Sequence, residues 1–412
     1  MILATIGPST CSDKDLKTIS KYTNFLRING SHNTINWHEK VSKKIRSINP
    51  KIKILLDIPG IKPRTLNKKN LSISENDNLT FYFKKKPSNQ SRCIELSKPL
   101  PTIKKNSKIF SITDGKYTFK ITKFEKYYIQ GKSSDNFILS PNQGLNIPNS
   151  IYDEKSQESA YLKFLKKAKN IKYDAIGLSF IKWEKIIKKI KKEFKNIEIV
   201  SKIENYLGLL NFKRIAIESN FIMIDRGDLT AEVGDSKLFS SIVEISNFLK
   251  EQNLPLIIAT GNLETMMSRS TPSKSEVFAL GFYKHMKFDR IMLSEETAIS
   301  SNWKNIINWL NKFLLNESNN IYKNVFGDKQ LVEDKNYSIW KTVSQLEDTP
   351  IIIFSRSGEA IQKVKSVNPF ANILVFTDSS RTIKLSKFWI NVECIYLNKF
   401  VNTKGNKFVF NT

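Results

Sequence analysis

Short apolar runs alternate along the chain with longer segments in which apolar and polar residues recur at helical spacing. This alternation is typical of a parallel α/β fold, in which each buried strand is followed by an amphipathic helix. Most runs lie roughly 25 to 35 residues apart, the length of one βα unit, and eight such units close a TIM (β/α)8 barrel. The eight predicted strands are Ile2–Ile6, Phe25–Ile28, Ile54–Ile58, Ala175–Phe180, Ile197–Ile203, Phe221–Ile224, Leu256–Ala259 and Arg290–Leu293.

The long interval between the third and fourth predicted strands has a different pattern. It is rich in short strands and turns, such as Leu79–Phe83, Lys108–Ile112 and Tyr117–Ile121, and shows no amphipathic helix. This pattern predicts a small inserted β-barrel domain. Because it follows a strand end, we expect it to form a lid over the mouth of the barrel.

The pattern changes again near the end of the chain. Pro350–Phe354 and Ile373–Thr377 predict strands around a helical Glu359–Val364, which indicates a small, truncated C-terminal α/β domain. We therefore expect the barrel at residues 1–58 and 149–320, the lid at 59–148 and the last domain at 321–412.

Composition and charge exclude some classes of protein. The 40% hydrophobic content favours a globular chain, and the longest apolar runs, such as Leu254–Ala259, are too short to span a membrane. Met1 opens directly onto a predicted strand, so we expect no signal peptide, and the three separated cysteines favour a reducing cytoplasm.

The net charge of +27 raises the alternative of a nucleic-acid-binding protein. However, the lysines are scattered, and those of Lys185–Lys192 alternate with isoleucines as on the solvated face of a helix. We therefore expect no nucleic-acid partner, and part of the positive charge could attract phosphate-bearing substrates.

The strongest candidate chemistry follows the fifth and sixth predicted strands. Lys202 and Glu204 in the segment IVSKIEN point to one side of a strand because they are two residues apart. In IMIDRGDL, Asp228 follows the next strand and a predicted turn with Gly227. Two carboxylates at neighbouring strand ends could hold Mg²⁺ or Mn²⁺, with the lysine neutralising a phosphoryl group. The alternative is a salt bridge inside the barrel, but buried charge there is unfavourable without a function.

Other polar residues follow the remaining strands at the same level. Taken singly, hydroxyls such as those of Thr260 and Ser294 are more often helix N-caps, but a shared level in the barrel favours a site. The members of this group are Arg27, Asn29, Ser31, Asp57, Thr260, Ser294 and Glu296.

Taken together, these segments resemble the pyruvate kinase family. The matching motifs, in the family's order, are ATIGPST, FLRINGSH, LLDIPGIKPRT, ITDGK, GLNIP, IVSKIENYLGLLNF, IMIDRGDL, IIATGNLETM and IMLSEETA, with a weaker IIIFSRSGEAIQKV. The resemblance implies phosphoryl transfer from phosphoenolpyruvate to ADP, giving pyruvate and ATP.

The resemblance also implies roles for matched residues. Glu204 and Asp228 would bind Mg²⁺, Lys202 would stabilise the moving phosphoryl group, and the Gly227 and Asp228 amides would receive the substrate carboxylate. Arg27 and Arg64 would contact phosphate, and Thr260, Ser294 and Glu296 would support protonation of the enolate. Asn29, Ser31 and Asp57 match the monovalent cation site of the family. Pro8, His32 and Trp37, with Arg64, would bind the nucleotide.

One departure from the family pattern concerns potassium. Lys62 stands where the family motif KGPEIRT has glutamate, and lysine at this position goes with potassium independence. A tethered ammonium could supply the charge of K⁺ at the cation site, so we expect activity without added K⁺.

Further departures lie at Pro59, Asp225, Gly261, Glu295 and in FALGFY after Glu276. They motivate an alternative function, a catalytically weak or inactive relative that binds phosphoenolpyruvate or nucleotide in a regulatory role. The short last domain predicts no strong activation by sugar bisphosphates, and the resemblance implies a homo-oligomer.

Overall fold

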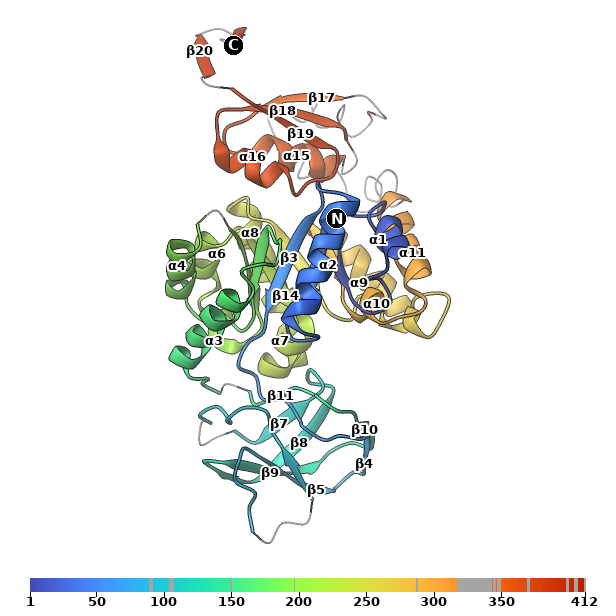
Figure 1. The fold of residues 1–412 in the computed structure, drawn as a ribbon, viewed down its shortest axis with the longest axis vertical. Helices are drawn as coiled ribbons and strands as arrows, with labels where there is room; N and C mark the ends of the chain where they lie inside the picture. Colours follow the sequence, from blue (N-terminus) through green and yellow to red (C-terminus); the bar gives the residue numbers. More distant parts are fainter. Residues whose placement is uncertain are drawn as a thin grey trace. The chain divides into compact units, whose positions relative to one another are not determined.

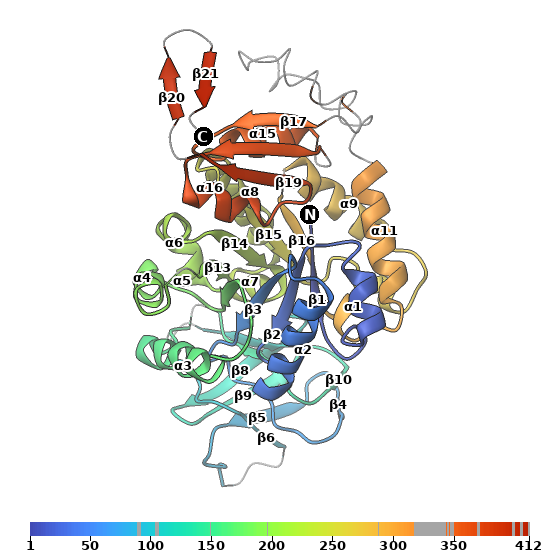
Figure 2. The same cartoon turned by 45° about the horizontal axis from the view of Figure 1, so that its top comes forward.

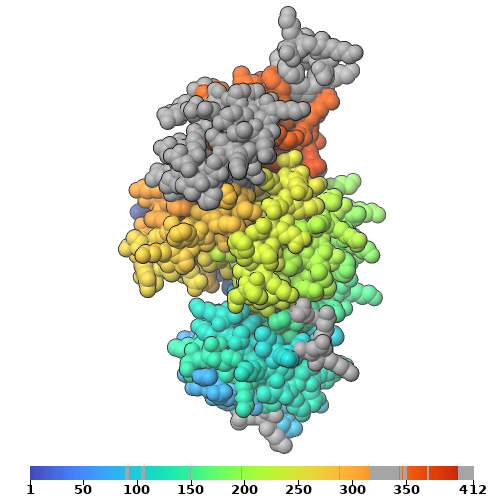
Figure 3. All heavy atoms as spheres, turned by 180° about the vertical axis from the view of Figure 1, so that it is seen from behind, coloured from blue at the N-terminus to red at the C-terminus, as the bar shows by residue number. Residues whose placement is uncertain are grey.

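The computed structural model describes most of the chain. The described residues are 1–88, 92–103, 107–148, 150–195, 197–286, 288–316, 343, 346, 350–368, 371–397, 400–403 and 407–410, and the others are grey in Figure 3. Much of the predicted start of the last domain, from residue 321, lies outside the described residues.

A closed parallel barrel of eight strands forms the centre of the fold and confirms the predicted fold class. All eight predicted strands are present, with ends that differ by a residue or two. Around the barrel their order is β1, β16, β15, β14, β13, β12, β3, β2. Their bounds are β1 Ile2–Ile6, β2 Phe25–Asn29, β3 Lys53–Ile58, β12 Ala175–Leu178, β13 Glu198–Ile203, β14 Phe221–Asp225, β15 Leu256–Ala259 and β16 Arg290–Leu293.

Apolar side chains explain why these short runs become strands. Every residue of β1, β13, β14, β15 and β16 is buried, as expected for parallel strands covered on both faces. The register pairs Lys202 with Met223 and Ile203 with Ile224, so the carboxyl ends of β13 and β14 lie at the same level. This register brings the predicted site residues of the two strands to one edge.

By its internal contacts, the chain divides into two compact units. One comprises Met1–Arg27, Lys43–Ile54 and Asn262–Thr412, and the other comprises Ile28–Ser42 and Leu55–Gly261. The predicted domain division at residues 58, 148 and 320 stays a prediction.

The unit that contains Leu55–Gly261 carries helices on the outside of β13 and β14, as Figures 1 and 2 show for α4 and α6. In α4, Ile186, Ile187 and Ile190 are buried, which confirms the predicted amphipathic helix. The helices that follow the barrel strands here are α3 Glu154–Lys167, α4 Glu184–Glu193, α5 Tyr206–Leu210, α6 Phe212–Glu218, α7 Arg226–Val233 and α8 Asp235–Glu251, and α2 Ile35–Ile48 follows β2.

The predicted all-β insertion belongs to the same unit and contains no helix among its described residues. We predicted a small barrel, and the described strands pair as a six-stranded sheet, β11-β7-β8-β9-β5-β6, and a two-stranded sheet, β10-β4. Both sheets contribute to one core in which Phe81, Phe110 and Phe119 are fully buried. The strands are β4 Leu71–Ile73, β5 Asn78–Tyr82, β6 Cys93–Glu95, β7 Ile109–Ile112, β8 Tyr117–Glu125, β9 Tyr128–Ser133, β10 Phe137–Leu139 and β11 Leu145–Asn146.

The other unit contains β1, β16 and the described part of the last domain. The last domain has a three-stranded parallel sheet, β17-β18-β19, followed by a two-stranded ribbon, and its predicted strands and helix are confirmed. The elements are α1 Asp13–Ile19, η1 Glu264–Met267, α9 Lys274–His285, α10 Glu295–Ala298, α11 Trp303–Asn316, β17 Ile351–Phe354, α15 Glu359–Val367, β18 Ile373–Thr377, α16 Ser380–Ser386, β19 Val392–Tyr396, β20 Phe400–Thr403 and β21 Lys407–Phe410. Within the described residues, none of these helices or those of the other unit is long and apolar enough to cross a membrane.

Candidate active site

Lys202 and Glu204 lie together at the carboxyl end of β13, as their spacing predicts. The Lys202 Nζ is 2.6 Å from Glu204 Oε1, and both side chains are almost completely buried. The other Glu204 oxygen accepts a hydrogen bond of 2.6 Å from the Phe180 backbone N–H. Both carboxylate oxygens are therefore held in place by the barrel.

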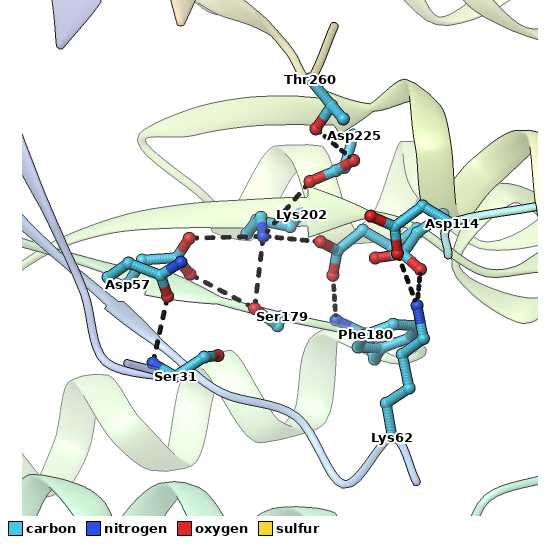
Figure 4. A network of polar contacts seen from close by, with 12 residues as sticks. Ser31, Asp57, Lys62, Asp114, Ser179, Phe180, Lys202, Asp225 and Thr260 are labelled. Carbon is cyan, nitrogen blue, oxygen red and sulfur yellow. Dashed lines mark hydrogen bonds and ion pairs between the residues drawn. The ribbon is translucent and has the colours of Figure 1, made fainter. Parts of the chain in front are cut away.

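The ammonium of Lys202 is the centre of a wider polar network (Figure 4). It lies 3.3 Å from Asp57 Oδ2 and 3.7 Å from Asp225 Oδ2, and it donates to Ser179 Oγ at 3.4 Å. Ser179 in turn donates to Asp57 Oδ1 at 3.2 Å. One buried lysine thus faces Asp57 of β3, Asp225 of β14 and Glu204, which directly follows β13.

Gly227 and Asp228 lie in the first turn of α7, which begins directly after β14 rather than after a separate turn. The first amides of a helix have no intrahelical partner and point toward anions. A Cβ at Gly227 would lie 2.9 Å from the Asp114 Cβ and 3.4 Å from Thr260, so glycine leaves these amides approachable.

Three buried carboxylates could hold a metal ion together. Glu204, Asp225 and Asp228 each offer an oxygen, and these oxygens all lie within 4.8 Å of one another. The sequence predicted Glu204 and Asp228 as ligands, and it identified Asp225 as a departure from the family pattern that adds a carboxylate near the cation, where it could tighten metal binding or repel substrate. A set of carboxylate oxygens fits Mg²⁺ or Mn²⁺ by its chemistry.

Burial of this cluster changes its protonation. Removal from water raises the pKa of Glu204 to about 8, with Asp225, Asp228 and Asp57 acting in the same direction and the Lys202 ammonium opposing them. Burial also raises the pKa of Asp228, where the Lys62 ammonium opposes the rise. Without a cation, Glu204 and Asp228 therefore retain protons more strongly than isolated carboxyls do.

Lys62 lies at this cluster. Its Nζ is bonded to Asp228 Oδ1, lies 2.9 Å from Asp114 Oδ1 and sits over the Phe180 ring. Asn146 Nδ2 also donates to Asp228 Oδ1, at 3.1 Å. The sequence predicted that Lys62 replaces the charge of a monovalent cation at Asn29, Ser31 and Asp57. In the structure its ammonium is bonded to Asp114 and Asp228, and the replacement stays a prediction.

Hydrogen bonds and an ion pair hold the residues of the predicted monovalent cation site in place. Asn29 Oδ1 accepts from the Ser31 backbone N–H at 3.0 Å, and Asp57 is buried against Ser179 and Lys202. Gly30 donates from its backbone to the Asp57 carbonyl at 2.8 Å, which brings the β2 end next to the β3 end. These residues therefore lie at one edge, as predicted.

Thr260 follows β15 and contacts Asp225. Its Oγ1 donates to Asp225 Oδ1 at 2.6 Å, and the guanidinium of Arg226 donates to its carbonyl. Thr260 has a φ of +70°, a left-handed conformation that is unfavourable for a β-branched residue. Such strain at a strand end is typical of functional sites.

The unit that contains β1 and β16 includes the predicted residues Arg27, Ser294 and Glu296. Arg27 is buried and donates to Thr5 Oγ1 at 3.0 Å. Glu296 accepts backbone N–H bonds from Asn262, Leu263 and Ser294, and burial raises its pKa. Its carboxyl therefore connects Asn262 and Leu263 to Ser294, which follows β16.

The predicted nucleotide-binding residues are more accessible. His32 and Pro8 are exposed, and Trp37 is half-buried with its ring against His38. His38 is buried and contacts this group, since its Nε2 is 2.7 Å from the His32 carbonyl oxygen. Arg64 donates to the Asn142 carbonyl at 2.9 Å.

A (β/α)8 barrel with lysine and acidic side chains at the carboxyl ends of its strands is typical of barrel enzymes, whose active sites lie at this face. The family described as pyruvate kinase, barrel domain, matches residues 1–305. The chain belongs to the pyruvate kinase family.

Three relatives illustrate the similarity. The pyruvate kinase of Dictyostelium discoideum is 28% identical over 93% of this chain and 81% of its own length. The pyruvate kinase of Buchnera aphidicola subsp. Acyrthosiphon pisum is 28% identical over 99% of this chain and 89% of its own length. The pyruvate kinase of Buchnera aphidicola subsp. Schizaphis graminum is 31% identical over 72% of this chain and 65% of its own length.

Proposed function

We propose that the protein transfers a phosphoryl group from phosphoenolpyruvate to ADP and releases pyruvate and ATP. The observation that carries this proposal is the meeting of Lys202, Glu204 and Asp228 at neighbouring strand ends, with the Lys202 ammonium 2.6 Å from the Glu204 carboxylate. A buried lysine beside acceptors for a divalent cation fits phosphoryl transfer, which depends on positioning and charge neutralisation.

Each group at the strand ends has a role in this reaction. Glu204 and Asp228 would hold Mg²⁺ or Mn²⁺, which when bound supplies positive charge to the substrate oxygens. Lys202 stabilises charge on the phosphoryl group during transfer, since its ammonium is fixed by carboxylates on two sides. The free amides of Gly227 and Asp228 receive the substrate carboxylate at the start of α7.

The remaining residues act on the phosphate, the proton and the nucleotide. Thr260 supports protonation of the enolate carbon, together with Ser294 and Glu296, and Arg27 contacts phosphate. Asn29, Ser31 and Asp57 form the monovalent cation site, and the accessible Pro8, His32, Trp37 and Arg64 bind the adenosine and phosphates of ADP.

The proposal also includes activity without added potassium. Lys62 brings a fixed positive charge to the carboxylates around the site, and this charge lowers the need for a bound monovalent cation. We propose that turnover needs a divalent cation and no added K⁺, in a cytoplasmic homo-oligomer.

One assay tests the reaction and its cations. ADP-dependent pyruvate formation from phosphoenolpyruvate is measured with Mg²⁺ and K⁺ varied separately, in tetramethylammonium buffer free of sodium. We expect pyruvate only with Mg²⁺ or Mn²⁺ and at least half of the full rate without K⁺. Binding of phosphoenolpyruvate without turnover, unchanged in Lys202→Ala, would support the regulatory alternative, and loss of most activity without K⁺ would contradict potassium independence.

A further inference from the structure

Asp225 adds a third negative charge to the divalent-cation site. It is the last residue of β14 and is buried, with one oxygen within 4.8 Å of oxygens of Glu204 and Asp228. Its Oδ1 accepts from Thr260 Oγ1 at 2.6 Å, while its Oδ2 lies 3.7 Å from Lys202 Nζ. A third carboxylate at this distance repels the other two when no cation is present.

Lys62 supplies positive charge on the other side of the same cluster. Its side chain is buried, and its ammonium is bonded to Asp228 and Asp114. The chain encloses it closely, because a Cβ at Gly144 would lie 2.3 Å from Lys62 Cε and 2.6 Å from Nζ. Glycine at position 144 therefore permits the lysine to reach Asp228.

The two residues change the charge of the site in opposite directions. Lys62 stands where the family motif has glutamate, and Asp225 stands where it has a small residue. Lys62 Nζ is bonded to Asp228 Oδ1, and an oxygen of Asp225 lies within 4.8 Å of an oxygen of Asp228. The two departures therefore act on one shared carboxylate, and each offsets the effect of the other.

We propose that Asp225 and Lys62 form a compensating pair, in which Asp225 is a third ligand of the divalent cation and Lys62 stabilises the three carboxylates until the cation binds. Lys62 then competes with the cation for Asp228. When the cation binds, the ammonium leaves Asp228 and stays bonded to Asp114. The inference rests on the proposed function only for the position of the cation site, not for turnover.

Binding of Mn²⁺, followed by electron paramagnetic resonance on the full chain, tests the ligand. We expect Asp225→Ala and Asp225→Asn to bind Mn²⁺ about tenfold more weakly than the unaltered protein. Glu251→Ala, which removes an exposed carboxylate from the end of α8, is the control and should bind normally. An affinity within twofold of the unaltered protein in both Asp225 variants would overturn the role of Asp225.

Two variants test the competition by Lys62 with different chemistry. Lys62→Met removes the charge, and Gly144→Ala keeps the charge but displaces the side chain from Asp228. Both should bind Mn²⁺ several-fold more tightly, while Lys69→Met, an exposed lysine of the insertion, should bind as the unaltered protein does. Unchanged or weaker binding in both variants would overturn the competition.

A double-mutant cycle in EDTA tests the compensation itself. Lys62→Met should lower Tm in the otherwise unaltered protein and lower it much less when Asp225→Ala is also present. Equal decreases in the two backgrounds would show that the residues are independent and would refute the pair. None of these measurements uses pyruvate formation. If the variants behave as expected but the protein forms no pyruvate, the proposed function is refuted and the compensating pair is still supported.

Discussion

At the scale of single residues, the site is a set of buried charges that neutralise one another. Lys202 is placed among Asp57, Glu204 and Asp225, and Lys62 is placed between Asp114 and Asp228. Buried charges are stable only when they are paired, so the removal of one partner affects structure as well as chemistry. Substitutions here therefore need measurements that separate activity from folding.

Lys202→Met tests the role of the ammonium in phosphoryl transfer. We expect kcat for pyruvate formation to fall by about a thousandfold, because a fixed positive charge at the developing charge is lost. Circular dichroism checks that the variant is folded, and Lys189→Met, which removes an exposed ion pair with Glu158, is the control. A fall of less than tenfold in a folded Lys202→Met protein would rule out this role.

Glu204 predicts how the stability of the metal-free protein depends on pH. Because its pKa is raised to about 8 from 4.5, the folded state holds a proton that the unfolded state has lost over this range. The free energy of unfolding in EDTA should therefore fall as pH rises from about 5 to about 8. Urea unfolding at several pH values measures this slope.

The matched variant for this slope is Glu204→Gln, which cannot titrate. Its slope between pH 5 and 8 should be shallower than that of the unaltered protein. Saturating Mn²⁺ should also restore stability at pH 8 more than at pH 6, since cation binding replaces the retained proton. Parallel slopes in the two proteins would mean that Glu204 titrates outside this window.

At the scale of elements, the strands were predictable because burial on both faces leaves nearly continuous apolar runs. The level of Lys202 and Glu204 followed from strand periodicity, and the meeting with Asp228 followed from the pairing of β13 with β14. The start of α7 at Arg226 was missed, because Gly227 beside two charged residues resembles a turn. Its contact with Lys62 was also missed, since 166 residues separate the partners and periodicity describes only local structure.

The helix α9 shows how the altered sequence after Glu276 remains helical. Ser273 accepts from the Glu276 N–H at 3.2 Å, and the Glu276 side chain accepts from the Ser273 N–H at 2.8 Å, which completes a capping box. Glu276 also accepts from the Thr265 N–H at 2.8 Å, so it connects α9 to η1. The local cap therefore stabilises the start of a helix over these departing residues.

Ser273→Ala should lower the free energy of unfolding by about 1 kcal/mol, because one N-terminal amide of α9 loses its acceptor. Urea denaturation measures the change, and Ser273→Asp, which can still cap the helix, should lose much less. If alanine and aspartate behave alike, the capping bond does not stabilise α9.

At the scale of the whole molecule, the net charge of +27 acts at long range on charged substrates. Phosphoenolpyruvate and ADP are anions, and a positive protein attracts them at a rate that decreases as salt screens the field. We therefore expect kcat/KM for phosphoenolpyruvate to fall several-fold between 20 and 300 mM tetramethylammonium chloride, while kcat changes little.

The same titration with KCl separates screening from a specific effect of K⁺, because both salts screen equally and only one supplies K⁺. Overlapping curves would agree with both screening and potassium independence, whereas a rise of kcat in KCl alone would show that a bound K⁺ is needed and that the charge of Lys62 does not replace it. A kcat/KM that ignores both salts would mean that the positive charge lies too far from the site to steer its substrates.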